Sequence, residues 1–188
     1  PVDESRATTR PATMVSTPAP SSQPWHSFPR GALAGNFVHD QLEWLAQEGF
    51  ALEDAPDLQL QLQRRCERQG WQARAPELQA WLMEAVATPL PPLGSSLRGV
   101  KKAMPEMEFW LPSASLVAAD VDALCQQHIL PGLARPALPE RELRGMLMGF
   151  ADLVFEHAGR YWVLDYKSNH LGPNDASYSA DALNSAMA

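Results

Sequence analysis

The sequence of 188 residues is long enough for one domain with a substantial core, and its 45% apolar and 20% charged residues are ordinary for a globular protein. No apolar run approaches the roughly eighteen residues of a membrane span, and the first residues do not resemble a signal peptide, so we expect no membrane partner. A net charge of −7 excludes a domain that grips nucleic acid by electrostatics alone, but not an enzyme that cuts nucleic acid with metal ions.

The N-terminal residues 1–24 differ in composition from the rest of the chain. They hold five of the 17 prolines, together with many Ser and Thr and almost no large apolar side chain. This composition is typical of a flexible linker, so we expect the folded domain over 25–188 and a larger protein upstream. Cys66 and Cys125 lack metal-ligand spacing, which indicates reduced structural thiols and a cytoplasmic location.

Apolar periodicity predicts helices and a strand over the middle of the chain, in the order helix Asn36–Glu48, helix Pro76–Pro89, strand Glu106–Pro112 and helix Ser115–Ile129. Asn36 can cap the first helix, and His39 borders its apolar face. The Ser115–Ile129 helix is expected to bury Leu124 and Cys125. A small-residue helix follows near Tyr178–Met187. This order predicts an α/β or α+β layer structure with a small sheet.

The segment between Gly149 and Asn169 places charged residues inside two apolar runs separated by the letters HAGR, a pattern that predicts a β-hairpin. A loop of even length would set Asp152 directly opposite Asp165, with Cβ atoms about 4.5–5.5 Å apart and Lys167 on the same face. A loop of odd length would shift this register.

Two facing carboxylates repel unless one is protonated or a cation lies between them. The alternative is a solvated face with an ordinary ion pair to Lys167. Both faces of the runs are apolar, with Phe150, Val154, Tyr161 and Val163 on the face of the two aspartates, and a strand apolar on both faces is usually buried. The residues therefore favour a metal site over a surface ion pair.

The same stretch carries a resemblance. The letters GMLMGFADLVF and GRYWVLDYKSNHLG resemble the nuclease motif of the RecB family, which belongs to the PD-(D/E)XK nuclease superfamily. The superfamily signature is an acidic residue, a spacer and D/E-x-K, here Asp152 and then Asp165-Tyr166-Lys167. The similarity covers about Trp25 to the end. It implies a restriction-endonuclease-like core, with a small mixed central sheet flanked by helices.

The resemblance also implies roles for individual residues. The stretch FPRGALAGNFVHDQLE resembles the family segment that brings a histidine, here His39, to the site. Mg²⁺ would be bound by His39, Asp152, Asp165 and the backbone carbonyl of Tyr166, and Lys167 would be the catalytic lysine. Mn²⁺ would substitute, and Ca²⁺ would bind but support little activity.

A glutamate of the family maps to the stretch EMEFWLP, where two candidates share a strand face. Glu106 is favoured by its spacing to Asp152, and Glu108 remains a possible accessory residue. We interpret Ser168 and Asn169, which follow the catalytic lysine, as structural.

The function implied is a Mg²⁺-dependent DNA exo/endonuclease domain that processes double-strand breaks and degrades foreign DNA in the bacterial cytoplasm. Its partners would be single-stranded DNA ends, RecC-like and RecD-like subunits, and an upstream helicase part of the same chain. A nuclease-fold docking module and a phosphoesterase for small substrates are the alternatives. The family's Q-x-x-x-Y helix after the lysine strand has no counterpart before Ala188, so we expect the nuclease domain to be incomplete at its C-terminus.

Overall fold

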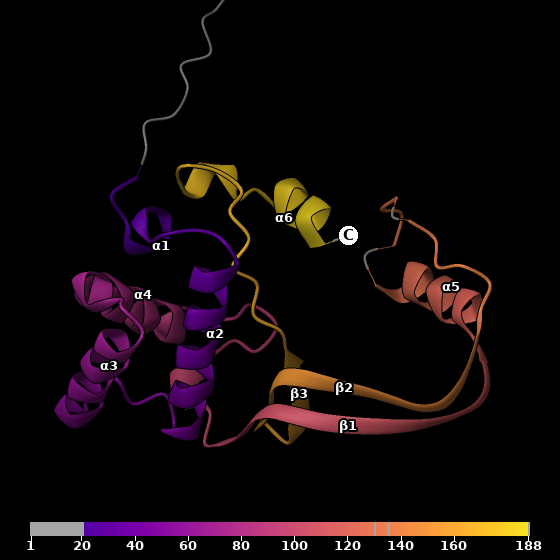
Figure 1. Cartoon of the computed structure of the whole chain (residues 1–188), viewed down its shortest axis with the longest axis horizontal. Coiled ribbons are helices and arrows are strands. Elements are labelled where there is room, and N and C mark those ends of the chain that lie inside the picture. Colours follow the sequence, from indigo (N-terminus) through magenta and orange to yellow (C-terminus); the bar gives the residue numbers. More distant parts are fainter. Residues whose placement is uncertain (1–20, 130, 135, 188) are drawn as a thin grey trace, which may run out of the picture.

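The computed structural model of the chain describes residues 21–129, 131–134 and 136–187, with helices gathered at one end and two long strands leading from them to a further helix (Figure 1). The linker expected over 1–24 lies mostly outside the described residues. Its last residues are described, and the backbone N–H of Ser21 donates to the carbonyl of Pro173 at 2.9 Å. The end of the expected linker therefore contacts the folded part of the chain.

The helical body consists of α1 (Pro24–Ser27), α2 (Ala32–Gln47), α3 (Pro56–Arg68) and α4 (Ala75–Ala87), with short 3₁₀ turns at Gln72–Arg74 and Leu97–Gly99. A proline lies in the first turn of α1, α3 and α4, where its missing N–H costs no hydrogen bond.

Two of these helices differ from the expectation. Gly31, with a φ of 104° that favours glycine, precedes α2, so the helix starts four residues before Asn36, which lies inside it and does not cap it. The sequence pattern also missed α3. That helix is mostly polar, and its buried residues form a narrow stripe of Leu58, Leu62 and Cys66, with Leu60 exposed.

The core lies among the helices of the body and takes in two residues of the sheet. Leu45, Leu62 and Leu78 are fully buried, and Leu153 and Phe155 from the second strand belong to the same apolar cluster. The ring of Trp71 stacks on those of Phe28 and Phe37, with centroids 5.5 and 5.6 Å apart. The sheet is therefore anchored to the helices by one face of its second strand.

The sheet contains β1 (Lys102–Val117), β2 (Glu142–His157) and β3 (Arg160–Leu164), in that order, and all of its pairings are antiparallel. The expected α/β class is confirmed, although no pairing among the described strands is parallel as a mixed sheet would require. Ala158 and Gly159 form the turn between β2 and β3 with positive φ values of 51° and 74°, as two-residue hairpin turns require. Leu153 pairs with Leu164, which is the register that an even loop predicts.

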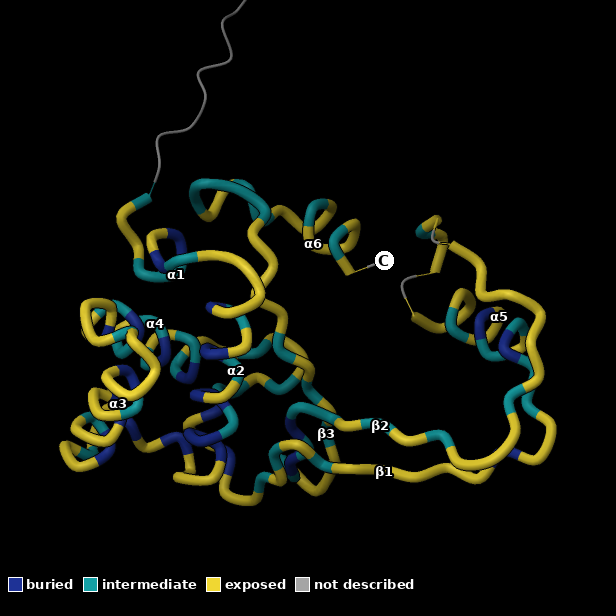
Figure 2. Tube along the Cα trace, viewed as in Figure 1, coloured by how far each residue is buried: buried dark blue, intermediate teal, exposed yellow. Residues whose placement is uncertain are grey.

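The expectation that these strands are buried on both faces is wrong. Phe150, Tyr161 and Val163 are 54%, 83% and 71% exposed, whereas Leu153 and Phe155 on the other face are buried. The helices cover only the face that carries Leu153 and Phe155. The apolar residues of the other face are therefore exposed, although their composition is similar. Figure 2 shows the change from buried to exposed where the strands leave the body.

The strands β1 and β2 continue far beyond the body, and we call residues 107–151 the arm. It ends in α5 (Ala118–His128), which begins three residues later than expected because Ser115–Val117 continue the strand. Leu124 is 59% exposed, which contradicts its expected burial. A 3₁₀ turn at Asp175–Ser177 and α6 (Ala180–Met187) follow β3. Among the described residues, no helix has the length and apolar character needed to cross a membrane.

Candidate active site

Asp152 lies on β2 next to the last pair of the β2–β3 ladder. Its carboxylate accepts a hydrogen bond from the backbone N–H of Tyr166 at 2.7 Å. The N–H of Tyr166 therefore donates to a side chain and not to a backbone carbonyl of β2, as it would if the strand continued. The ladder stops there, and β3 ends at Leu164. Asp165 is therefore not a ladder partner of Asp152, which corrects the expected direct pairing, although the register beside it is as expected.

Asp165 and Lys167 form an ion pair at the surface. Lys167 Nζ lies 2.6 Å from Asp165 Oδ2, and the two side chains are 49% and 53% exposed. The hydrogen bond to Asp165 raises the pKa of Lys167, with the charges of Asp165 and Asp152 adding to the effect. The ammonium therefore stays protonated at neutral pH and can stabilise negative charge, but it is a poor proton acceptor.

Tyr166 anchors the motif between these two charged residues. Its side chain packs against the core, and burial, helped by the charge of Asp152, raises the pKa of its phenol. Because side chains alternate along an extended segment, burial of Tyr166 directs Asp165 and Lys167 outward.

His39 approaches Asp152 from α2. Its Nδ1 lies 3.8 Å from Asp152 Oδ2, and its ring stands edge-on to that of Tyr166, with centroids 5.9 Å apart at 90°. The buried residues Val38 and Leu42 hold this turn of α2 in the core, which fixes where His39 emerges. The structure thus brings His39 and Asp152 together, as the resemblance to the family's nuclease motif predicts.

Glu106 interacts electrostatically with Asp152 and His39, and Glu108 makes a different contact. Glu106 lies on β1 across from Asp152, between the pairs Pro105–Leu153 and Met107–Ala151, and has a positive φ of 47°. Burial raises the pKa of its carboxyl, the charge of Asp152 raises it further, and His39 lowers it, so the three groups are within electrostatic reach. Glu108 instead accepts a hydrogen bond from the indole N–H of Trp110 at 2.8 Å.

The donors present match a hard divalent cation in type. Carboxylate oxygens with one imidazole and a backbone carbonyl suit Mg²⁺ or Mn²⁺, which keep several waters and use few protein ligands. Across the described part of the chain, however, no three His, Cys, Asp or Glu side chains are close enough to hold one ion. Asp165 instead pairs with Lys167, and its side chain is 53% exposed.

Gly35 is a residue whose importance the sequence reasoning missed. A Cβ at this position would lie 2.8 Å from Ser168 Oγ, closer than real contacts allow. Gly35 is one helical turn before His39, and a side chain there would force the Ser168 hydroxyl to rotate away from α2. A glycine inside a helical pattern, four residues before a candidate ligand, is the sequence signal that could have found it.

Comparison with known proteins agrees with this geometry. The family model of the PD-(D/E)XK nuclease superfamily matches residues 23–185. RecBCD enzyme subunit RecB of Escherichia coli is 38% identical over 166 residues, which cover 86% of this chain and 14% of the relative. RecB of Mycobacterium tuberculosis is 33% identical over 198 residues, covering 88% of this chain and 18% of the relative. The chain thus spans less than a fifth of the length of these relatives, and it belongs to the PD-(D/E)XK nuclease superfamily.

Proposed function

We propose that the chain is the nuclease domain of a RecB-type helicase–nuclease subunit, and that it hydrolyses phosphodiester bonds of DNA with Mg²⁺. One observation carries the proposal: His39 and Asp152 meet at the end of the β2–β3 ladder, directly beside the Asp165-Tyr166-Lys167 signature. The similarity to RecB over most of the chain supports the assignment to this type.

We assign His39, Asp152, Asp165 and the backbone carbonyl of Tyr166 to holding the cation. When bound, the ion would lower the pKa of a coordinated water and neutralise charge on the scissile phosphate. Asp165 accepts from Lys167 through Oδ2, so its second oxygen can bind the cation without loss of the ion pair.

Lys167 and Glu106 have different tasks in this proposal. Lys167 remains protonated, because its pKa is raised, and stabilises the charge that develops on the phosphate. Glu106 is the better proton acceptor, since its carboxyl lies near Asp152 and its raised pKa increases its basicity. It would accept a proton from the attacking water.

The names of the relatives support a proposal for partners and cellular role. RecB is a subunit of the RecBCD enzyme in those organisms. We infer that this domain works beside RecC-like and RecD-like subunits, with a helicase part of its own chain delivering single-stranded DNA ends. Its role would be double-strand-break processing and foreign DNA degradation in the bacterial cytoplasm.

Cleavage of an end-labelled single-stranded oligonucleotide tests the proposal, with Mg²⁺ and with EDTA. Glu106→Gln should reduce cleavage strongly and Glu108→Gln should not, because only Glu106 lies near Asp152 and His39. These two variants remove the same charge from the same strand. Equal activity of the two, or cleavage that persists in EDTA, would contradict the proposal. Cation binding without any cleavage would instead support the docking-module alternative.

A further inference from the structure

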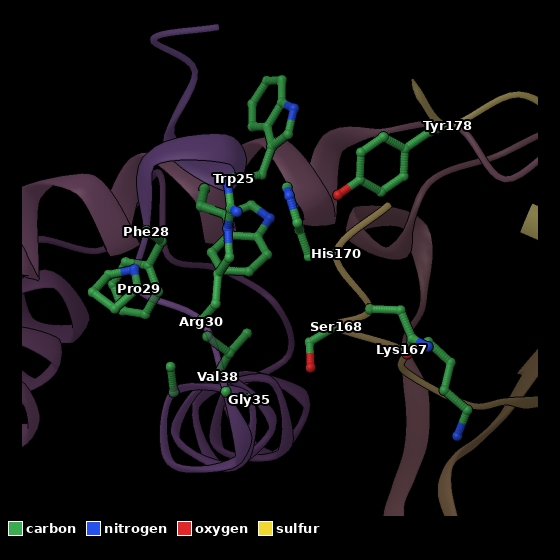
Figure 3. A pocket seen from close by; sticks show the side chains of 14 residues that line it. Trp25, Phe28, Pro29, Arg30, Gly35, Val38, Lys167, Ser168, His170 and Tyr178 are labelled. Carbon is green, nitrogen blue, oxygen red and sulfur yellow. The ribbon is translucent and has the colours of Figure 1, made fainter. Parts of the chain in front are cut away.

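A cavity lies beside the segment that follows Lys167, and none of the proposed cation ligands lines it. Its volume is about 240 Å³, and it is enclosed by α1, the start of α2 and the residues that follow Lys167 (Figure 3). A neighbouring hollow of about 420 Å³ reaches from there to His39. The two share Gly31, Gly35, Ser168 and Asn169 in their walls, so a continuous surface connects His39 with the cavity.

The charge of the cavity wall is opposite to that of the chain. Its lining includes Arg30, His170 and Lys167, whose ammonium is paired with Asp165, and no Asp or Glu is among the fourteen described residues that form it. The whole chain, in contrast, has a net charge of −7. Burial and the charge of Arg30 lower the pKa of His170, so this imidazole is neutral at neutral pH and offers hydrogen bonds, while Arg30 carries the positive charge. The cavity is thus a local site for anions.

Aromatic rings form another part of the wall. Trp25, Phe28, Trp81 and Tyr178 line the cavity, and in Figure 3 Arg30, His170 and the hydroxyl side of Tyr178 face its centre from different sides. The rim is held in place by hydrogen bonds. The Tyr178 hydroxyl accepts from the backbone N–H of Leu171 at 3.3 Å, and the Trp25 indole donates to Asp175, outside the lining, at 2.9 Å.

We propose that this cavity binds one nucleotide of a single DNA strand, next to the nucleotide whose phosphate is cleaved. Arg30 would pair with its phosphate, and the base would stack on the aromatic rim formed by Trp25 and Tyr178. Cationic side chains interleaved with aromatic rings are how proteins hold single strands without reading their sequence. The proposal rests on the proposed nuclease function, because it extends the path of the same substrate.

The size of the cavity restricts the substrate. Pockets that hold whole small molecules measure roughly 300–1,000 Å³, so about 240 Å³ can take the base of one unpaired nucleotide, with its phosphate at the rim, and not a base pair. The cavity therefore predicts that single strands bind to this domain better than blunt duplexes do.

Fluorescence anisotropy of a labelled octathymidylate, measured in EDTA, tests binding apart from cleavage. Arg30→Gln should weaken binding on the order of tenfold, because it removes one charge-assisted hydrogen bond. It should also reduce the slope of log K against log salt by about 0.7, the value for one phosphate contact to a single strand. Arg64→Gln, which removes the same charge from an exposed position on α3, is the matched control and should bind like the parent protein.

Trp25 tests the stacking part of the proposal. Trp25→Ala should weaken binding about 5- to 150-fold, and Trp25→Phe should restore most of it because a ring remains. Thermal melts of each variant establish that it is folded. Equal binding by Arg30→Gln and Arg64→Gln, failure of Phe at position 25 to restore binding, or a blunt duplex that competes as well as the single strand would overturn the subsite.

The two proposals fail in different ways. If Mg²⁺-dependent cleavage is present and Arg30→Gln binds normally, the subsite is wrong and the nuclease stands. If Arg30→Gln loses binding but the parent protein never cleaves, the subsite is supported and the nuclease assignment fails.

Discussion

The helical body and the arm differ in what they do with large apolar side chains. In the body Leu45, Leu62 and Leu78 are no more than 1% exposed, whereas in the arm Trp110 and Leu111 are each 54% exposed. No described arm residue belongs to the main apolar cluster. Figure 2 shows the boundary between the two regions, and Asp152 and Glu106 lie at it.

This difference separates stability from chemistry along the same strands. The body supplies the burial that fixes α2 and therefore His39. The proximal ends of β1 and β2 supply the acidic residues, and the arm beyond them adds little buried apolar area. Because burial of apolar surface is the dominant favourable term in folding, we expect the free energy of unfolding to depend on the body and hardly on the arm.

The largest effect should come from emptying the core of the body. Leu78→Ala should lower the free energy of unfolding by about 2–5 kcal/mol, because it removes a fully buried side chain and leaves a cavity. Leu111→Ala makes the same chemical change in the arm and should cost about 0.5 kcal/mol or less. Urea unfolding of both variants measures the comparison. Similar losses would show that the arm shares the stability of the body.

Lys167 tests the chemistry at the boundary of the two regions. Lys167→Gln should reduce Mg²⁺-dependent cleavage about 10²–10³-fold, since it removes a positive charge that acts on the transition state. Cation affinity should change little, because an ammonium group has no lone pair with which to ligate a metal. Lys101→Gln, at an exposed position just before β1, is the charge-matched control. Normal cleavage by Lys167→Gln would remove this residue from the mechanism.

Cation binding should join the body to the sheet and therefore stabilise both. At a concentration one hundred times its dissociation constant, a bound ion adds about 2.7 kcal/mol to the free energy of unfolding. Melting temperature should rise with Mn²⁺ and with Ca²⁺, and the rise should vanish in Asp165→Ala. Ca²⁺ should support little cleavage because its coordination geometry is looser. Identical melting curves in EDTA and in millimolar Mn²⁺ would contradict a cation site.

The smallest effect concerns a contact that ties α1 to the segment after β3. Hydrogen bonds from the Trp25 indole and then from His26 lower the pKa of Asp175, whose carboxylate lies 2.7 Å from His26 Nε2. The ionised form is thus favoured in the folded state. Its contribution is fully present above the ordinary carboxyl pKa and is lost as pH falls through the lowered value.

Asp175→Asn should therefore flatten the loss of stability below about pH 4, because the variant has no such carboxylate to protonate. Urea unfolding from pH 3 to pH 7 measures the difference from the parent protein. Asp54→Asn, at another exposed position, should leave the curve unchanged in shape. Parallel curves for the parent protein and Asp175→Asn would show that this contact does not stabilise the fold.

The sequence by itself determined the hairpin, and it left the register to whether the loop has an even or an odd number of residues. The turn at Ala158–Gly159 needs only two residues with positive φ, and a two-residue loop sets every pairing that follows it. Proline likewise marked the start of α4 from the sequence. These are local properties, because neighbouring residues and backbone geometry decide them. The superfamily signature was readable for the same reason, since Asp165, Tyr166 and Lys167 are consecutive.

Only the tertiary structure decided what surrounds the signature. The end of β3 at Leu164 depends on the carboxylate of Asp152, and Glu106, not Glu108, lies across from that carboxylate. The exposure of Tyr161 and Val163 depends on which sheet face the helices cover. Each of these outcomes is a contact between residues distant in sequence, and an apolar or acidic side chain has the same local pattern whether or not such a contact forms.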